Sequence, residues 1–579
     1  MTKHSGKSIT PIDQSDSQGQ NIETPREIPA RRGFSVSYRG KTLLSRIDPI
    51  SQGERLAAEI PLNERTLYFC PSPLYGYGLS LVLEKLPEDS AILCAEADDC
   101  LFEISEKALS AISFPSQGEN PMPLALARVK DPESLCAFVR KTWGERQFRR
   151  LEVIRLTGGW QVFPHLYEDC ANTLRREIAL EWGNAMTLIR LGRLYSRNLI
   201  RNLTLLHNGD SIAALDYGPS PVLALGAGPS LDILLDELCG ISKGAISLPA
   251  QRRFRIICAD TCLPALHDRG IIPDLVVILE SQHWNLRDFS GGKGRPVDAA
   301  IDLSALPAST RILGGNRFFF ATPWTQMTLF SRLSEAGLLP ETLPPMGSVG
   351  LSTVALALRI STGPVLSGGI DFSFTLDSYH ARSTPAHSEL SRSQNRLKSV
   401  VNAGAAFREG VFTAFSKTGK PIRSDPALRN YRDLFEREFG GNDRLMDIEG
   451  PGLDLGVKVI PLAQACGILL GGEAAPLPPI VPAESAGVKG EKLAAFINRE
   501  MGTLIALRDM LSGKELAEGK HLDELLDYAN YLWAHFPDCA GRGGRRPPAT
   551  DLSFLKRVRT EIDPFLELWE MALGELEEG

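Results

Sequence analysis

A glycine-rich turn, Gly226-Ala227-Gly228-Pro229-Ser230, joins an apolar run to a helical pattern and is the strongest candidate for ligand chemistry in this sequence. Because Gly226 and Gly228 lack a Cβ, the backbone can turn sharply and approach a ligand. The first amides of a helix have no internal partner, and the helix dipole adds partial positive charge there. The Ser230 hydroxyl adds another donor. We expect a seat for a phosphate or carboxylate; the alternative is a capped turn that holds no ligand.

Two later apolar runs, 255–259 and 274–279, end in polar residues. The first is followed by Asp260 and Thr261, and the second by Glu280, Ser281 and Gln282. In open α/β sheets, ligands bind outside the carboxyl ends of the strands, so these side chains are candidates for ribose, sugar or metal contacts. Their simpler role is to cap the helices that follow, and for Asp260 that alternative is strong.

The loop after a third apolar run carries titratable side chains that suit catalysis. Its candidates are Asp371, Thr375, Asp377, Tyr379 and His380. Histidine titrates near neutral pH, so His380 is the candidate general base, and Asp371 or Asp377 is the candidate partner that orients its ring. Thr375 and Tyr379 are candidate sugar contacts. The alternative is an inert loop histidine.

A second glycine-rich helix start contains Gly347 and Ser348. It lacks the Gly-Lys-Ser/Thr of a phosphate-binding loop, so we predict no ATP site there. Its amides are candidates for contacts with the sugar or with an anion, and close helix packing is the alternative. We expect no metal site, because no His, Cys or carboxylate cluster has ligand spacing.

The elements that position these residues alternate between strand and helix patterns. Strands are predicted at 222–225, 255–259 and 274–279, and a helix is predicted from about 229 to 239, with Gly240 as its terminator. This alternation favours a parallel sheet covered on both faces. We therefore predict an α/β protein with Rossmann-like parallel-sheet domains at the N-terminus and centre, followed by a C-terminal helical domain.

Composition shifts along the chain divide it into six predicted segments. They are a disordered tail (1–32), an N-terminal Rossmann-like domain (33–169), connecting helices (170–207), the central catalytic domain (208–471), a linker (472–490) and a helical domain (491–579). The N-terminal domain has a Gly76-Tyr77-Gly78 turn and a strand ending at Glu96. A purely structural role for it is at least as well supported as a nucleotide site.

The overall composition limits the partners and the compartment. The net charge is −7, which argues against a general nucleic-acid or anionic-membrane binder. The ten cysteines are scattered and several lie in apolar runs, as expected for reduced thiols. Neither a secretory signal nor an apolar stretch of about 20 residues is present, so we expect a cytoplasmic protein that does not span a membrane. The C-terminal helices suit packing, homo-oligomerisation or a protein partner.

Four motifs occur in the order found in one known family. GAGPSLD, ADTCLPALHDRGIIPDLVVILESQ, MGSVGLSTVALAL and GGIDFSFTLDSYHA resemble the motility accessory factor (Maf) family, whose members contain the MptE-like domain of unknown function 115. The resemblance spans about residues 60 to 460. It departs from the family pattern at Gly369-Ile370-Asp371, where the family has Gly-Gln-Asp, and at Glu280-Ser281, where the family has Asp-Pro.

The resemblance implies a flagellin glycosyltransferase. Such enzymes transfer a nonulosonic acid, such as pseudaminic or legionaminic acid, from its CMP-activated donor to Ser or Thr of flagellin. The GAGPS turn is also similar to a nucleotide loop of bacterial sialyltransferases, which would place Gly226, Gly228, Pro229 and Ser230 against the donor nucleotide. No cofactor beyond the CMP-sugar is implied, and the need for a divalent metal stays open.

Two other functions remain open at this point. One is a pterin diphosphokinase, the activity that names the MptE-like domain, which would need ATP, magnesium and clustered carboxylates. The other is a flagellin-binding chaperone that has kept the fold and lost catalysis.

Overall fold

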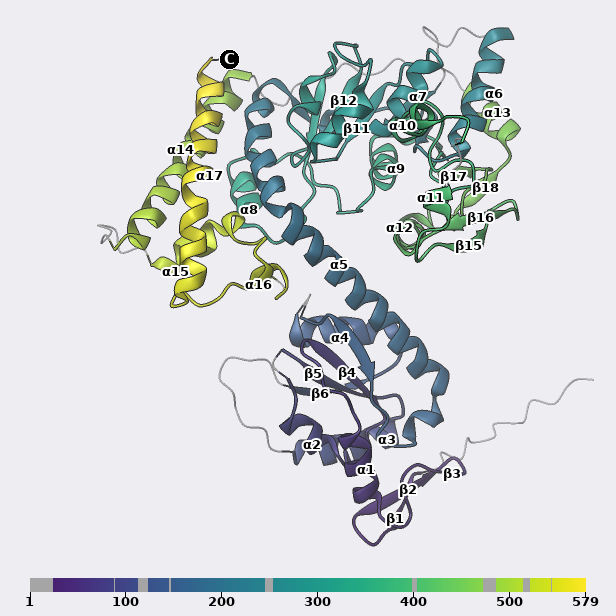
Figure 1. Ribbon diagram of the computed structural model, residues 1–579, viewed down its shortest axis with the longest axis vertical. Helices are drawn as coiled ribbons and strands as arrows, with labels where there is room; N and C mark the ends of the chain where they lie inside the picture. The colour runs from purple at the N-terminus through teal and green to yellow at the C-terminus, as the bar shows by residue number, and fades with distance from the viewer. Residues whose placement is uncertain are drawn as a thin grey trace, which may run out of the picture. The chain divides into compact units, whose positions relative to one another are not determined.

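The computed structural model describes residues 24–87, 89–112, 123–144, 147–244, 254–397, 403–471, 486–513, 521–542 and 544–578. They form two compact units (Figure 1): Met1–Met186 with Gly541–Gly543, and Thr187–Ala540 with Gly544–Gly579. Most of the expected tail and linker, residues 1–23 and 472–485, lies outside the described residues.

The first unit contains a parallel sheet of four strands in the order β6-β5-β4-β7. The strands are β4 (Thr66–Pro71), β5 (Ala91–Glu96), β6 (Leu124–Arg128) and β7 (Arg150–Val153). The helices are α1 (Pro49–Ala58), α2 (Leu79–Glu84), α3 (Asp99–Ser110) and α4 (Pro132–Trp143). This confirms the N-terminal parallel α/β sheet.

Ordered structure begins earlier than the sequence suggested. A small antiparallel sheet joins β1 (Arg26–Pro29), β2 (Phe34–Tyr38) and β3 (Lys41–Thr42). The last residues of the expected tail are therefore a strand, because β1 pairs with β2 from Arg26↔Ser37 to Pro29↔Phe34. Such backbone pairing leaves almost no pattern in a segment of four residues.

One helix, α5 (Pro164–Leu203), replaces the several connecting helices expected between 170 and 207. It begins in the first unit and ends in the second. After Pro164 it contains no proline, and its two glycines are isolated, each costing only about 1 kcal/mol relative to alanine. Nothing in the segment therefore breaks the helix.

The second unit is built on a sheet of nine parallel strands in the order β18-β17-β14-β9-β10-β11-β12-β13-β8. The strands are β8 (Asp210–Ser211), β9 (Val222–Leu225), β10 (Arg255–Ala259), β11 (Leu275–Ile278), β12 (Asp298–Asp302), β13 (Arg317–Phe320), β14 (Val365–Gly368), β17 (Leu445–Ile448) and β18 (Lys458–Ile460). The predicted parallel sheet of the central region is confirmed.

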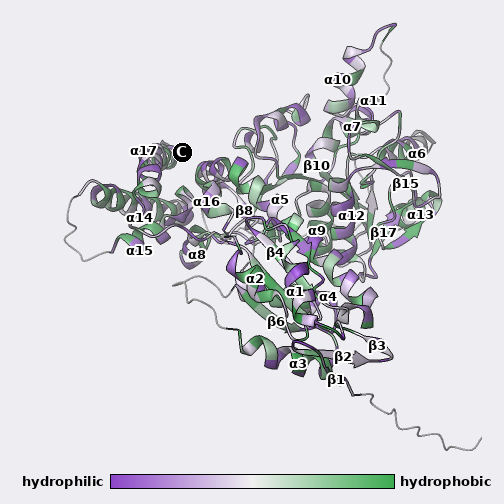
Figure 2. Ribbon diagram, turned by 60° about the horizontal axis from the view of Figure 1, so that its bottom comes forward, coloured by the Kyte–Doolittle hydropathy of each residue, from purple (hydrophilic) through white to green (hydrophobic). Residues whose placement is uncertain are grey.

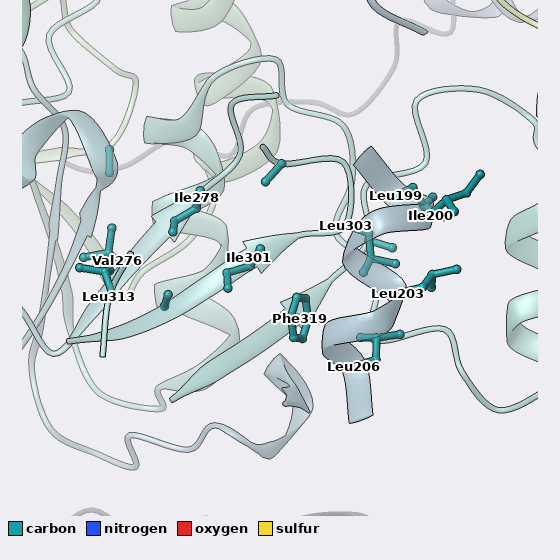
Figure 3. Close-up of a cluster of buried hydrophobic side chains, with 14 of the residues drawn as sticks. Leu199, Ile200, Leu203, Leu206, Val276, Ile278, Ile301, Leu303, Leu313 and Phe319 are labelled. Carbon is teal, nitrogen blue, oxygen red and sulfur yellow. The ribbon is translucent and has the colours of Figure 1, made fainter. Parts of the chain in front are cut away.

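Both faces of this sheet are covered, because successive strand residues point to opposite sides. In β9, Leu223 and Leu225 join one hydrophobic cluster, whereas Val222 and Ala224 join the other. The first cluster includes α6 (Ser230–Gly244), α7 (Leu263–Asp268), α13 (Leu462–Gly471) and the last turns of α5. Figure 3 labels members of this cluster on the end of α5 (Leu199, Ile200 and Leu203) and on the neighbouring strands (Ile301 and Phe319).

The opposite face is covered by α9 (Val349–Ile360) and α12 (Pro426–Phe439). Helices on both faces show hydrophobic and hydrophilic residues side by side in Figure 2, as expected for elements with one buried side. Helix α6 continues to Gly244 instead of stopping at Gly240. A single interior glycine lowers helix stability without ending the helix.

The C-terminal part is helical, as predicted. It contains α14 (Ala486–Leu511), α15 (Leu522–Tyr528), α16 (Pro537–Ala540) and α17 (Leu552–Glu578). Side chains from α14, α15 and α17 join the first hydrophobic cluster of the second unit. Within the described residues, every helix is too short or too polar to cross a bilayer.

The strand order reverses next to β9, and this reversal places the site. From β9 the chain adds β10, β11, β12 and β13 on one side, and then returns through α9 to place β14 on the other side. Loops leaving β9 and β14 therefore diverge at the carboxyl edge of the sheet. Such a switch point is where open α/β sheets bind ligands.

Candidate functional site

A cavity of about 180 Å³ opens at this switch point. Eight of the candidate residues predicted from the sequence line it: Gly226, Ala227, Gly228, Thr261, Ser348, Asp371, Tyr379 and His380. Nine other candidates do not line it: Pro229, Ser230, Asp260, Glu280, Ser281, Gln282, Gly347, Thr375 and Asp377. The fold thus brings together motifs that are up to about 150 residues apart in the chain.

The amides of the glycine-rich turn are already used inside the protein. The Gly226 amide donates to the Gly368 carbonyl at 2.9 Å, and the Gly228 amide donates to the Gly369 carbonyl at 2.7 Å. The Ser230 amide and hydroxyl donate to the two oxygens of the buried Asp371 carboxylate, at 2.7 and 2.6 Å. The expected anion seat at the start of α6 is therefore occupied by a carboxylate from the neighbouring loop.

The two glycines are needed for contact between loops. A Cβ on Gly228 would lie 2.5 Å from Asp371 Oδ2, and a Cβ on Gly226 would lie 2.6 Å from the Gly369 carbonyl oxygen. Both distances are too short for a side chain. The sequence correctly indicated a close approach at these positions, but the approaching group is the β14 loop.

The open helix N-terminus at the cavity belongs to α9. Ser348 is its N-cap and makes no side-chain capping bond, and Ser348, Val349 and Gly350 all line the cavity. Free amides and the dipole of this 12-residue helix give partial positive charge at the cavity wall. Gly347 lies just outside with φ +65°, and a Cβ there would lie 3.1 Å from the Tyr431 ring.

His380 is held in one orientation by the backbone. Its Nδ1 lies 3.3 Å from the Ala227 carbonyl oxygen, so the neutral ring donates from Nδ1 and leaves the Nε2 lone pair available. Burial lowers the pKa of His380 below its usual 6.5, and the hydrogen bond to Ala227 opposes this only in part. The ring is therefore neutral at pH 7 and suited to accept a proton.

The two carboxylates expected to orient His380 have other roles. Asp371 binds Ser230, and burial raises its pKa. Asp377 is exposed and does not line the cavity. A backbone carbonyl is the orienting partner, and it has no residue type by which sequence reasoning could identify it.

Aromatic residues form another part of the wall. Tyr379 lies edge-on to His380, with ring centroids 4.9 Å apart. The ring centroids of Phe372 and Tyr431 are 6.2 Å apart. Both tyrosines and Phe372 line the cavity. Sequence reasoning missed Tyr431, because it lies on α12 among charged residues and no local pattern marks it.

A pair of carboxylates lies beyond Thr261. The side-chain amide of Asn285 donates to Asp260 Oδ2 at 2.7 Å and to Asp288 Oδ2 at 3.1 Å. The backbone amide of Thr261 donates to Asp260 Oδ1 at 2.8 Å. Burial raises the pKa of Asp260 to about 6 and that of Asp288 to about 7. Thr261 is the member of this group that reaches the cavity; Asn285 and Asp288 were missed.

The polar residues after β11 hold loops together. The Gln282 amide donates to Glu280 Oε1 at 2.9 Å, and the Ser281 carbonyl accepts from Asn198 of α5 at 3.0 Å. Among the described residues, no group of three or more His, Cys, Asp or Glu side chains is placed to hold a metal ion.

Comparisons with known proteins found a matching domain model, a relative of nearly full length and a shared fold. A family model described as 6-hydroxymethylpterin diphosphokinase MptE-like matches residues 197–377. An uncharacterized protein of Treponema pallidum (strain Nichols) is 30% identical over 564 residues, which cover 94% of this chain and 95% of that protein. A Maf glycosyltransferase structure from Magnetospirillum magneticum AMB-1 shares the fold, with a TM-score of 0.52 and 14% identity over 94% of this chain and 89% of that one.

The matched segment begins within α5 and ends just before His380, so it contains the glycine-rich turn, the start of α9 and Asp371. The cavity is therefore built largely from the part of the chain that defines the family. The chain contains an MptE-like domain, and it belongs to the same family as the Treponema pallidum protein that it matches over nearly its whole length.

Proposed function

We propose that this protein is a cytoplasmic glycosyltransferase that moves a nonulosonic sugar from a CMP-activated donor to Ser or Thr of flagellin. The observation that carries the proposal is that His380 and the open start of α9 line one cavity. A base for the acceptor hydroxyl and a seat for the donor phosphate would then face the same space. The fold shared with a Maf glycosyltransferase supports the same class of reaction.

In the proposed reaction, the amides at Ser348, Val349 and Gly350 bind the phosphate of the donor. The acceptor oxygen forms a bond to the anomeric carbon, while the bond from that carbon to the phosphate oxygen breaks and CMP leaves with the electron pair. The acceptor proton moves to His380 Nε2. The helix terminus stabilises the charge that develops on CMP, which is the kind of fixed electrostatic stabilisation that dominates many active sites.

The mass of flagellin tests this proposal. Flagellin made in a host that supplies the activated sugar should gain the sugar mass when this protein is present. We expect His380→Ala to slow transfer roughly 10²- to 10⁴-fold, the usual contribution of a general base, while CMP still binds in calorimetry. Asp377→Asn is the matched control, because Asp377 is exposed and outside the cavity. Full sugar addition by the His380 variant would exclude the base role.

A second candidate is ATP-dependent pterin diphosphorylation, which the description of the matching family model favours. The carboxylates of Asp260 and Asp288 would be its available metal ligands. Ligand-dependent melting separates the alternatives, because a ligand stabilises the state that binds it. CMP should raise the melting temperature under the transferase proposal, and ATP with magnesium under the kinase proposal. A flagellin-binding chaperone would respond to neither.

A further inference from the structure

The backbone that follows His380 is bonded directly to the start of α6. Ala381 is fully buried, and its amide donates to the Ala227 carbonyl at 2.9 Å. The next amide, that of Arg382, donates to Asp232 Oδ2 at 3.0 Å. The same Ala227 carbonyl oxygen lies 3.3 Å from His380 Nδ1. These two backbone bonds therefore set the distance between the His380 ring and the carbonyl that orients it.

Asp232 uses its two oxygens for different purposes. It lies in the first turn of α6, where the partial positive charge of the helix start favours a carboxylate, and its side chain is 17% exposed. One oxygen accepts from the backbone amide of Arg382. The other accepts from Arg269 of the α7 end at 2.8 Å and lies 3.4 Å from Arg382 Nε. A single carboxylate thus holds both the backbone and the guanidinium group of Arg382.

Asp236, one turn further along α6, makes only the second kind of contact. It accepts from Arg269 at 3.2 Å and from Arg382 Nη2 at 2.5 Å, and its side chain is 57% exposed. Within the described residues, its hydrogen-bond partners are these two guanidinium groups. The two acids share one pair of arginines, so the bond to the backbone two residues after His380 is what distinguishes Asp232.

The turn that ends this segment depends on its surroundings. Ser383 has φ +70°, in the left-handed region that residues other than glycine rarely adopt. Its hydroxyl donates to the Asp268 carboxylate, at the end of α7, at 2.8 Å. Such a backbone conformation persists only where neighbouring contacts fix it. Loss of the bond from Asp232 should therefore let residues 380–383 shift away from the β9 loop.

We propose that Asp232 is a positioning residue for the transfer reaction: by accepting from the Arg382 amide, it holds the backbone that carries His380 against the Ala227 carbonyl. This inference rests on the proposed function. The alternative is that Asp232 acts only through its ion pairs, as Asp236 does. In that case it contributes to stability and not to the orientation of His380.

Three variants separate these roles in the full chain. Asp232→Ala should lower kcat roughly 10- to 100-fold, the scale of a misplaced catalytic group, while KM and CMP affinity change by less than about threefold. Asp232→Asn loses the charge but keeps an oxygen that can accept from the Arg382 amide, so it should recover most of the lost kcat. Asp236→Ala is the matched control, because it removes ion pairs to the same arginines and should leave kcat unchanged.

Two results would assign the effect of Asp232 to charge and overturn the positioning role. One is an equal loss of kcat in Asp232→Ala and Asp236→Ala. The other is an Asp232→Asn variant as slow as Asp232→Ala. Asparagine has nearly the shape of aspartate, so Asp232→Asn should fold even where the alanine variant does not, and melting temperatures check this for each protein.

Nitrogen NMR of the His380 ring gives a readout that does not depend on transfer. In the unaltered protein the Nδ1-protonated form should dominate, with the signal assigned by its loss in His380→Gln. Asp232→Ala should give a mixture of the two neutral forms, and Asp236→Ala should not. An unchanged His380 signal in folded Asp232→Ala would overturn the positioning role while leaving the proposed function intact. Absence of transfer by the unaltered protein would refute the proposed function, and the NMR result would still decide whether Asp232 holds His380.

Discussion

The two units contain parallel sheets that reverse their strand order in the same way. In the first unit, β5 and β6 follow on one side of β4, and β7 lies on the other; in the second, β10 follows on one side of β9, and β14 lies on the other. Glycine-containing turns leave both β4 and β9. Topology alone would therefore predict a ligand site in each unit.

In the first unit, side chains fill the corresponding edge. Ser72, after β4, is fully buried, and a Cβ on Gly159 would lie 2.1 Å from its hydroxyl oxygen. The Thr157 hydroxyl donates to the Ser72 carbonyl at 2.6 Å. The Tyr167 hydroxyl donates to Glu96 at 2.8 Å, and burial raises the pKa of Glu96 to about 7. The comparison teaches that strand order creates an edge where ligands can bind, and that side-chain packing decides whether a cavity remains.

The largest expected effect is on CMP binding at the sheet edge of the second unit, where the cavity lies. Ser348→Asp places a carboxylate at the start of α9, where it should cap the helix and repel a phosphate. Two charges about 4 Å apart near a protein surface interact by about 4 kcal/mol, so CMP affinity should fall roughly 100- to 1,000-fold. Calorimetry measures this, with neutral Ser348→Asn as the control. Because an aspartate cap favours the helix, the ligand-free melting temperature should not fall. Unchanged CMP affinity would place the phosphate elsewhere.

At the sheet edge of the first unit, the buried Glu96 should make the stability of that unit depend on pH. The pKa of Glu96 is raised from 4.5 to about 7, so its stabilising contribution is fully present below pH 4.5 and is lost as the pH rises to about 7. The whole contribution is about 3 kcal/mol. Glu96→Gln should remove this pH dependence, measured by hydrogen exchange at the amides of β4 and β5. Asp99→Asn is the control, because the Asp99 side chain is 85% exposed. The same pH dependence in Glu96→Gln would refute the assignment.

Matched glycine substitutions compare the two edges directly. Gly159→Ala and Gly228→Ala should each lower the free energy of unfolding by about 1–3 kcal/mol, because the added methyl meets a buried oxygen in both units. Gly228→Ala alone should also weaken CMP binding, since it displaces the β9 loop. Gly502→Ala in α14 is the control, with open space around its Cβ. Equal loss of CMP affinity in the Gly159 and Gly228 variants would contradict the contrast between the edges.

The smallest expected effect concerns pH and the reaction rate. Because burial lowers the pKa of His380 below 6.5, the base stays unprotonated across neutral pH. The transfer rate, as kcat/KM, should stay level between pH 8 and 6.5 and decline only at lower pH, towards tenfold per pH unit. An acidic limb centred at pH 7 or above would show that a different group, such as Asp288, controls the reaction.

Local patterns in the sequence predicted the core elements closely. Strands β9 and β10 have the predicted limits, 222–225 and 255–259, because short runs of buried apolar residues are typical of central parallel strands. The predicted strand 274–279 contains β11 (Leu275–Ile278). The two-residue strand β8 and the strand β12, which has aspartate at both ends, were not predicted because their hydrophobic signal is short or interrupted.

The sequence by itself determined the α/β class, the principal motifs and the glycines at the close contact, because these follow from residue type and spacing within a few turns of the chain. Only the tertiary structure decided that Asp371 fills the start of α6, that α9 offers the open terminus, and that Ala227 orients His380. Those facts depend on which loops meet across the sheet edge. Contacts between segments more than 100 residues apart leave no periodic pattern in either segment.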